Sequence, residues 1–424
     1  MVDVWLPYGK TDACVRIPTR NFLGSIKPME KPVAPDAKAE VQRALRDPIG
    51  SKTLSNIVQP EHKVAIVVDD ITRPAPSDIM VPPILDELNM MGVKEENITV
   101  IFGCGTHRAV THEEALKLLG EDIVNRVNVM SHDCKAQDLV YVGKTRKHGT
   151  KVYLNRVFAE ADTKIVTGDV CFHYYAGYGG GRKSVLPAVS GEETIRHNHV
   201  MLLHPKAKTG VLEGNPVHED MVEAARLAKV DFALNVVISN EGEIVKAFAG
   251  DLERVFYEGT KLVNEMCRVQ VDRKADIVVV SPGGHPADVN LFQAYKAVDN
   301  ALEVVKRGGV VVLVAECPEG HGNKVFYDWM VKFKDLKAVE RAVKRRFVLG
   351  GHKAYYLMKA LRKVQIIMVS SMPDYYATNV FRLKTARAVN DALNQAFNVT
   401  GRKVKIWAMP YGNFTLPEIK TGED

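Results

Sequence analysis

Alternating buried strands and amphipathic helices constrain the fold of this chain more than any other feature of its sequence. Three continuous apolar runs each lead into Gly or Asp, where a loop begins: KVAIVVDD (63–70), NITVIFGCG (97–105) and TKIVTGDV (163–170). Such runs are typical of strands in parallel sheets that helices cover on both faces. We therefore predict an α/β fold with mostly parallel sheets.

The helices between these strands carry their own start signals. Ser77 begins an amphipathic run that stops at Gly92, and we expect Ser77 to be its N-cap. Thr111 and Glu114 form a T-x-x-E pattern before the next apolar run. This pattern predicts a capping box, in which each side chain binds the backbone of the other residue.

A second series of strands and helices begins near Ala275, and the chain length sets the number of domains. The chain has 424 residues, whereas a single core stops growing at roughly 250 to 300 residues. We expect two α/β domains, residues 1–270 and residues 271–424, with the last residues, about 408–424, packing back on the first domain. Ligands of open α/β sheets bind beyond the carboxyl ends of the strands and often between domains. We therefore expect the active site in the interdomain cleft.

Composition and charge argue against several classes of protein. The net charge is +6, but the 57 Lys and Arg residues are scattered among 51 Asp and Glu residues, which does not favour a nucleic-acid partner. No segment has the roughly 18 uncharged apolar residues of a membrane-spanning helix, and the N-terminus lacks the pattern of a signal peptide. The six cysteines include no C-x-x-C pair. We expect no membrane association, no disulfide framework and a cytoplasmic location.

Polar side chains follow each of the three strands. In D-D-I-T-R-P, Arg73 is either a turn residue paired with an aspartate or an anion-binding fork that Asp70 orients, with Thr72 between them. His107 follows the second strand and His173 the third. Most lone histidines are structural, but imidazole titrates near neutral pH, so both are candidate acid/base groups. On parallel strand ends, they can approach one ligand from different sides.

The third strand leads into a glycine-rich loop, FHYYAGYGGGRKSVLPA (172–188). It is not a Walker A motif because Arg182 separates Gly181 from Lys183, and no G-x-G-x-x-G fingerprint is present. The loop is either a flexible turn or an anion-binding nest to which Arg182 and Lys183 add positive charge. Lys183 is either solvated or a point of covalent attachment.

Two further pairs carry candidate binding groups. His197 and His199 are two residues apart on a predicted helix and face different ways, so spacing does not say which one binds a metal. Gln293 and Lys296 are three residues apart and share a helix face. That face is either an ordinary solvated surface or a site for a small polar anion.

Taken together, these motifs resemble the nickel-pincer-dependent lactate racemase family of 2-hydroxyacid racemases and epimerases. The motifs in question are D-D-I-T-R-P, G-T-H-R, H-Y-Y-A-G-Y-G-G-G-R-K-S-V-L-P, N-H and F-Q-A-Y-K, and they extend over essentially the whole chain. The resemblance implies an isomerase whose N-terminal domain binds the cofactor and carries the catalytic residues. Its C-terminal domain would contribute substrate-binding residues.

The cofactor implied by the resemblance is a nickel-pincer nucleotide, Ni(II)-pyridinium-3-thioamide-5-thiocarboxylic acid mononucleotide. Cofactor-biosynthesis enzymes would supply it. In the family a lysine holds this cofactor through a thioamide and a histidine is the fourth nickel ligand, and the matching residues are Lys183 and His199. Soft sulfur ligands with one imidazole suit square-planar nickel.

The resemblance also implies the remaining roles. His107 and His173 match two acid/base histidines that exchange the hydroxyl proton while the α-hydrogen leaves as hydride. The cofactor-contacting loop matches Asp70, Ile71, Thr72 and Arg73. The substrate contacts match Arg73, Gln293 and Lys296.

The chain departs from the lactate racemase pattern at positions that border the substrate in the family. Ile71 stands where the family has a histidine, Phe292 where it has a tyrosine, and GGHKAYY around His352 replaces a region with a tryptophan. The substrate is therefore left open among lactate, another short 2-hydroxy acid and malate. The alternatives are a C2 epimerase of a sugar acid such as gluconate and a non-catalytic binder of an anionic nucleotide-like ligand. A metal-dependent hydrolase is disfavoured because carboxylates and histidines do not cluster in the sequence.

Overall fold

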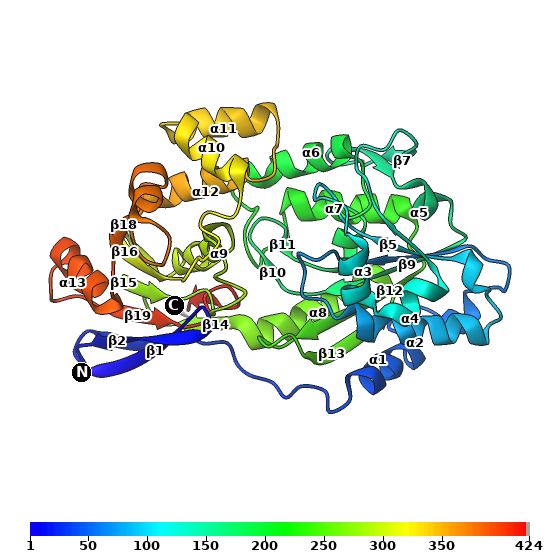
Figure 1. Cartoon of the computed structure of the whole chain (residues 1–424), viewed down its shortest axis with the longest axis horizontal. Helices are drawn as coiled ribbons and strands as arrows, with labels where there is room; N and C mark the ends of the chain where they lie inside the picture. Colours follow the sequence, from blue (N-terminus) through cyan, green and yellow to red (C-terminus); the bar gives the residue numbers. More distant parts are fainter. Residues whose placement is uncertain (421–424) are drawn as a thin grey trace. The chain divides into compact units, whose positions relative to one another are not determined.

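The computed structural model describes residues 1–420, which form two units, each built on its own sheet (Figure 1). One unit is Glu30–Glu265, here called the inserted unit. The other joins Met1–Met29 to the chain from Met266 onward, and is here called the split unit. The predicted α/β class with mostly parallel sheets and two domains is confirmed.

The division between the units differs from the predicted boundary. Residues 1–29 group with the C-terminal segment and not with residues 30–265. Of the residues expected to pack back on the first domain, 408–420 also belong to the split unit, and 421–424 lie outside the described residues. The cause is strand pairing across the whole chain length, because Phe22 pairs with Ile406.

The inserted unit has a six-stranded sheet of order β13-β12-β9-β4-β5-β6. Only β13, at one edge, runs antiparallel to its neighbour. The strands are β4 (Val64–Val68), β5 (Ile98–Phe102), β6 (Asn128–Ser131), β9 (Thr163–Asp169), β12 (Phe232–Ile238) and β13 (Ile244–Gly250). Every residue of β4 is buried, as its unbroken apolar run predicts.

Helices and short hairpins complete the inserted unit. The helices are α1 (Ala37–Arg46), α2 (Ser77–Met90), α3 (His112–Leu119), α4 (Glu121–Arg126), α5 (Arg156–Glu160), α6 (Glu192–Val200), α7 (Pro216–Ala228) and α8 (Leu252–Cys267), the last of which runs into the split unit. The hairpins are β7 (Val140–Lys144) with β8 (Lys151–Leu154), and β10 (Phe172–His173) with β11 (Gly177–Tyr178). The second hairpin is followed by a 3-10 turn, Gly181–Ser184.

The split unit has a second six-stranded sheet, of order β18-β17-β16-β15-β19-β3, in which every pair is parallel. Its strands are β3 (Phe22–Ser25), β15 (Ala275–Val280), β16 (Val305–Val314), β17 (Gln365–Val369), β18 (Lys384–Ala386) and β19 (Ile406–Met409). Its helices are α9 (Leu291–Ala301), α10 (Lys324–Lys332), α11 (Leu336–Arg345), α12 (Gly351–Leu361) and α13 (Val389–Thr400). Two more strand pairs are β1 (Val2–Tyr8) with β2 (Thr11–Ile17), and β14 (Arg268–Val271) with β20 (Leu416–Ile419).

Each unit has its own apolar core. In the inserted unit, side chains of β4, β5 and β12 pack against α1 and α2. In the split unit, the core of β15, β16 and β19 packs against α13 and the β1–β2 hairpin, which is drawn in blue in Figure 1. None of the helices within residues 1–420 is both long enough and apolar enough to cross a membrane.

The two predicted helix starts have different outcomes. Thr111 and Glu114 form the expected capping box at the start of α3. Ser77, in contrast, is the first residue of α2 and not its N-cap, and the preceding Pro76 has no side chain that could cap. Helix α2 therefore begins after Pro76 without a capping hydrogen bond from a side chain.

Candidate functional site

A hydrogen bond between Asp70 and His107 joins the loops that follow β4 and β5. Asp70 Oδ2 lies 2.6 Å from His107 Nδ1, while Asp70 Oδ1 accepts the Thr72 backbone N–H at 2.9 Å and its hydroxyl at 2.5 Å. Burial raises the pKa of Asp70, but the hydrogen bonds from His107 and Thr72 outweigh it, so the pKa lies below its usual value. A carboxylate on Nδ1 fixes the ring orientation and makes Nε2 the nitrogen for proton exchange.

A second group of charges surrounds Arg73 in the same loop. The nearby carboxylates of Asp69, Asp70 and Asp169 raise the pKa of its guanidinium, although burial works in the opposite direction. Ile71, the remaining loop residue of the predicted set, is 36% exposed. The structure thus gives Arg73 carboxylate neighbours and gives Ile71 no polar role.

The glycine-rich loop is closely packed against its own unit. A Cβ on Gly180, whose φ is +72°, would lie 2.7 Å from the Asp169 carbonyl oxygen. A Cβ on Gly181, whose φ is +54°, would lie 2.8 Å from Cβ of Phe256. Both glycines are therefore required by positive φ and by close approach of neighbouring atoms.

Arg182 holds this loop from inside. Its Nη2 donates to the Ala176 carbonyl at 2.7 Å, Nη1 to the Gly180 carbonyl at 3.1 Å, and Nε to His218 Nδ1 at 3.0 Å. Its guanidinium carbon also lies 4.1 Å from the centre of the Phe256 ring. Burial lowers the pKa of Arg182 to about 9. The donors of Arg182 are therefore committed to loop carbonyls and to His218.

Tyr175 brings three of the predicted site residues together. Its ring lies edge-on to His173 at 4.4 Å between centroids and edge-on to His199 at 5.4 Å. The Lys183 amine is 5.9 Å from the centre of the same ring. Burial raises the pKa of the Tyr175 hydroxyl, and nearby Arg73 partly opposes this. The cluster therefore connects the glycine loop and α6 with the loop after β4.

The two histidines of α6 have different surroundings. His199 is 4% exposed, and its Nδ1 is 3.0 Å from Asn198 Oδ1. Asn198 is itself held, because its Nδ2 donates to Asp220 Oδ2 at 2.9 Å. His197 Nδ1 instead contacts the Thr150 hydroxyl at 2.6 Å, at the surface of the unit. A supported ring with one nitrogen hydrogen-bonded is the usual arrangement of a metal-binding histidine, which favours His199.

Lys183 is buried, with 8% of its surface exposed. Burial and the positive charges of Arg73 and Arg182 hold its pKa well below the usual value, and Cys171 and Asp69 only partly offset this. A lysine in this setting is neutral over more of the pH range and is correspondingly nucleophilic.

In the split unit, α9 presents Gln293 and Lys296. Asn290 caps this helix, and its Oδ1 accepts the Gln293 backbone N–H at 3.1 Å. Lys353 of α12 is 1% exposed, with its amine 5.2 Å from the Phe292 ring and 5.1 Å from the Tyr295 ring. Burial and the charge of Lys296 hold the pKa of Lys353 well below normal, partly offset by Asp299.

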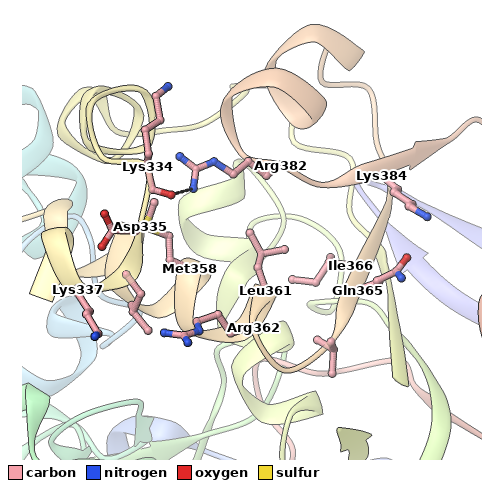
Figure 2. A pocket seen from close by; sticks show the side chains of 12 residues that line it. Lys334, Asp335, Lys337, Met358, Leu361, Arg362, Gln365, Ile366, Arg382 and Lys384 are labelled. Carbon is pink, nitrogen blue, oxygen red and sulfur yellow. Dashed lines mark hydrogen bonds between the residues drawn. The ribbon is translucent and has the colours of Figure 1, made fainter. Parts of the chain in front are cut away.

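A pocket of about 710 Å³ also lies in the split unit, between the start of α11, the end of α12 and the strands β17 and β18 (Figure 2). None of the predicted site residues lines it. Arg382 of this pocket donates hydrogen bonds to the Lys334 and Phe333 carbonyl oxygens, at 3.1 and 2.6 Å, and so caps the C-terminal end of α10. Nothing in this pocket resembles the chemistry of the two clusters above.

Several residues of these clusters were not found from the sequence. Tyr175 lies within the quoted loop, but a tyrosine beside glycines gives no signal that it contacts His173 in the same loop and His199 on α6. Asp169 ends β9 and has a buried Oδ2 without a hydrogen-bond partner. Lys353 looks like a surface lysine until the fold buries it. Within residues 1–420, the structure holds no group of three or more His, Cys, Asp or Glu side chains suited to a metal ion.

Comparison with known proteins covers nearly the whole chain. Residues 8–210 match the sequence family described as the lactate racemase N-terminal domain, and residues 270–414 match the lactate racemase C-terminal domain. The chain is 34% identical over 421 residues to a lactate racemase of Thermoanaerobacterium thermosaccharolyticum, covering 97% of this chain and 98% of that protein. It is 32% identical over 422 residues to a lactate racemase of Lactiplantibacillus plantarum, covering 97% and 99%.

Solved structures agree with this result. The lactate racemase apoprotein from Thermoanaerobacterium thermosaccharolyticum superposes with a TM-score of 0.92 at 32% identity, covering 98% of this chain and all (100%) of that chain. A Thermotoga maritima protein has a TM-score of 0.66 at 20% identity, covering 91% of this chain and 97% of that one. This second likeness concerns the fold alone.

Proposed function

This chain belongs to the lactate racemase family and is an isomerase of the racemase type, and on that basis we propose that it racemises a 2-hydroxy acid with a nickel-pincer nucleotide. The observation that carries the proposal is the convergence of His173, His199 and Lys183 on the Tyr175 ring. These three residues match an acid/base group, a nickel ligand and a cofactor tether. The proposed substrates are lactate, another short 2-hydroxy acid or malate.

Two features of the inserted unit fit this cofactor. His199 is buried and oriented by Asn198, as a metal ligand requires. Lys183 is a buried amine with a lowered pKa, as a covalent tether requires. A single histidine also suffices as the protein's nickel ligand, because the pincer supplies the other three donors, two of them soft sulfur.

When bound, the nickel-pincer nucleotide would accept the α-hydrogen of the substrate as hydride. The protein's own contribution is proton transfer and orientation. His107, held by Asp70 through Nδ1, exchanges the hydroxyl proton through Nε2. His173 accepts the Ala176 backbone N–H at Nδ1, at 3.3 Å, so its Nε2 carries the exchangeable proton. One histidine would serve each enantiomer.

Substrate orientation would come from charged and polar side chains. Arg73 has the planar geometry to bind the substrate carboxylate in a bidentate manner. Gln293 and Lys296 share a face of α9 and would bind the remaining oxygens of the substrate. An alternative substrate class, sugar acids such as gluconate, would use the same residues for epimerisation at C2.

The test is to express the chain together with cofactor-biosynthesis enzymes, which are its proposed partners. Intact mass and nickel content are measured first, and a panel of single-enantiomer hydroxy acids is then followed by chiral chromatography. We expect an adduct on Lys183, near-stoichiometric nickel and racemisation of at least one acid. No adduct, substoichiometric nickel and no racemisation would together reject the proposal. A binder without catalysis would show the adduct or nickel but leave every acid unchanged.

A further inference from the structure

Asp69 and Asp169 lie at the carboxyl ends of two neighbouring strands. β4 and β9 pair in parallel through Val67 and Val166, so the residues just beyond them are neighbours. The Asp69 carboxylate accepts a hydrogen bond from the backbone amide of Asp169. A Cβ on Gly168 would lie only 3.3 Å from Asp69 Oδ2, which places this carboxylate directly over β9.

This carboxyl pair has no role in the acid/base chemistry described above. Asp169 is 3% exposed, and its Oδ2 has no hydrogen-bond partner. A buried carboxylate oxygen without a donor is costly, unless it serves a group that arrives later. Burial and the like charge of Asp169 raise the pKa of Asp69 to about 7, with Arg73 opposing and Asp70 adding to the rise.

Asp69 also lies near Ser184, the residue that follows the proposed tether. The same Cβ on Gly168 would lie 3.5 Å from the Ser184 hydroxyl oxygen, and Ser184 follows Lys183 in the chain. Asp69 is among the groups whose charge acts on Lys183, together with Arg73, Arg182 and Cys171. The Asp69 carboxyl, whose pKa is raised, therefore lies close to the segment that carries Lys183, whose pKa is lowered.

We propose that Asp69 is the acid that donates a proton when Lys183 is joined to a thiocarboxylate of the cofactor, and that Asp169 is a positioning residue that acts through Asp69. This inference rests on the proposed function, because it requires a thioamide tether. It concerns the loading of the protein and not the turnover of substrate.

The chemistry balances without another reactant. A bond forms between Lys183 Nζ and the thiocarboxylate carbon, and the carbon–oxygen bond breaks. The oxygen leaves as water, taking one proton from the amine and one from the Asp69 carboxyl. The products are the thioamide, water and ionised Asp69, so the total charge is unchanged. Asp69 then regains a proton from solvent.

The experiment follows adduct formation and not racemase activity. Purified cofactor-free chain is mixed with a pyridinium bisthiocarboxylate mononucleotide, and the rate of mass gain on Lys183 is measured from pH 5.5 to 9. We expect the wild-type rate to fall above about pH 7, as Asp69 loses its proton. Asp69→Asn should lower the rate at pH 6.5 by about tenfold or more and remove this fall.

Further variants distinguish the roles of the two carboxylates. Asp169→Asn should keep the fall in rate with rising pH but move it to lower pH, because the negative charge of Asp169 no longer acts on Asp69. Asp69→Glu should restore a pH-dependent rate, which a purely structural role of Asp69 would not do. Arg108→Ala is the matched control, because Arg108 pairs with Glu114 at the surface, and its rate and pH profile should equal those of the wild type.

The outcomes distinguish this inference from the proposed function. If the wild type forms the adduct but its rate does not fall above pH 7, or if Asp69→Asn behaves like the wild type, the role of Asp69 is overturned while the racemase proposal stands. If the wild type forms no adduct and racemises nothing after co-expression, the proposed function itself fails. The wild-type pH profile decides the point even where a variant does not fold.

Discussion

Replacing Asp70 by Asn tests whether the hydrogen bond to His107 supports proton transfer. The substitution keeps the shape and an oxygen for Thr72, but it removes the negative charge 2.6 Å from His107 Nδ1. An amide nitrogen facing Nδ1 also favours the opposite tautomer of the ring, which puts the proton on the wrong nitrogen.

The size of the effect follows from the contact that is lost. A hydrogen bond to a charged partner contributes about 1.5 to 3 kcal/mol, and about 1.4 kcal/mol corresponds to a factor of ten in rate. We therefore expect kcat to fall roughly ten- to 150-fold, with a smaller change in KM. Because the substitution cannot change the equilibrium constant between the two enantiomers, kcat/KM must fall by the same factor in both directions of the isomerisation.

The assay is the initial rate of enantiomer interconversion by chiral chromatography, at equal nickel and equal Lys183 adduct. Arg108→Ala, one residue from His107 but exposed and paired with Glu114, should change the rate less than threefold. An Asp70→Asn enzyme with full cofactor loading and a kcat within threefold of wild type would refute the reasoning. Reduced loading would instead identify Asp70 as a cofactor contact.

Three more predictions follow from the glycine loop and its supports. Gly181→Ala should destabilise the fold by about 3 kcal/mol in denaturant unfolding, against about 1 kcal/mol for Gly242→Ala, because both have positive φ but no atom lies within 4 Å of a Cβ at Gly242; equal losses would contradict the packing argument. Burial and Arg182 lower the pKa of His218 to about 3, so the unfolded chain takes up the proton first and stability should decline as pH falls from about 6.5 towards 3. His218→Gln should flatten this decline in thermal unfolding, and an unchanged slope would exclude His218 as its source. Asn198→Ala should weaken nickel retention against a chelator by about tenfold to 100-fold, whereas equal retention would mean that the contact to His199 does not matter.

Much of the fold could be predicted because its signals are local. The apolar runs ending at Asp70, Gly105 and Val170 are strands β4, β5 and β9, and the Thr111 capping box starts α3. Ser77 was mistaken for a cap because its residue type suits that position, although the preceding proline occupies it. Local pattern identifies elements well and their ends less well.

Long-range contacts are what the sequence could not provide. The N-terminal strands join the C-terminal sheet through pairing between Phe22 and Ile406, which no periodicity indicates. Arg182 is a possible source of positive charge for an anion nest by sequence, but the fold turns its donors onto loop carbonyls. Tyr175 and Asp169 acquire their positions only when strands and loops from distant segments meet. The roles of the candidate residues remain predictions that the experiments above can test.

The split unit has a consequence for how this protein is made. Synthesis releases all of Glu30–Glu265 before the strands β15 to β19 exist, so the inserted unit can fold while the chain is still growing. β3, which is made before the inserted unit, has to wait for β19 (Ile406–Met409), its partner in the sheet. β3 is thus made before the inserted unit but reaches its native pairing only after β19 is made, and a polypeptide truncated before β19 would leave the edge of β3 exposed to other chains.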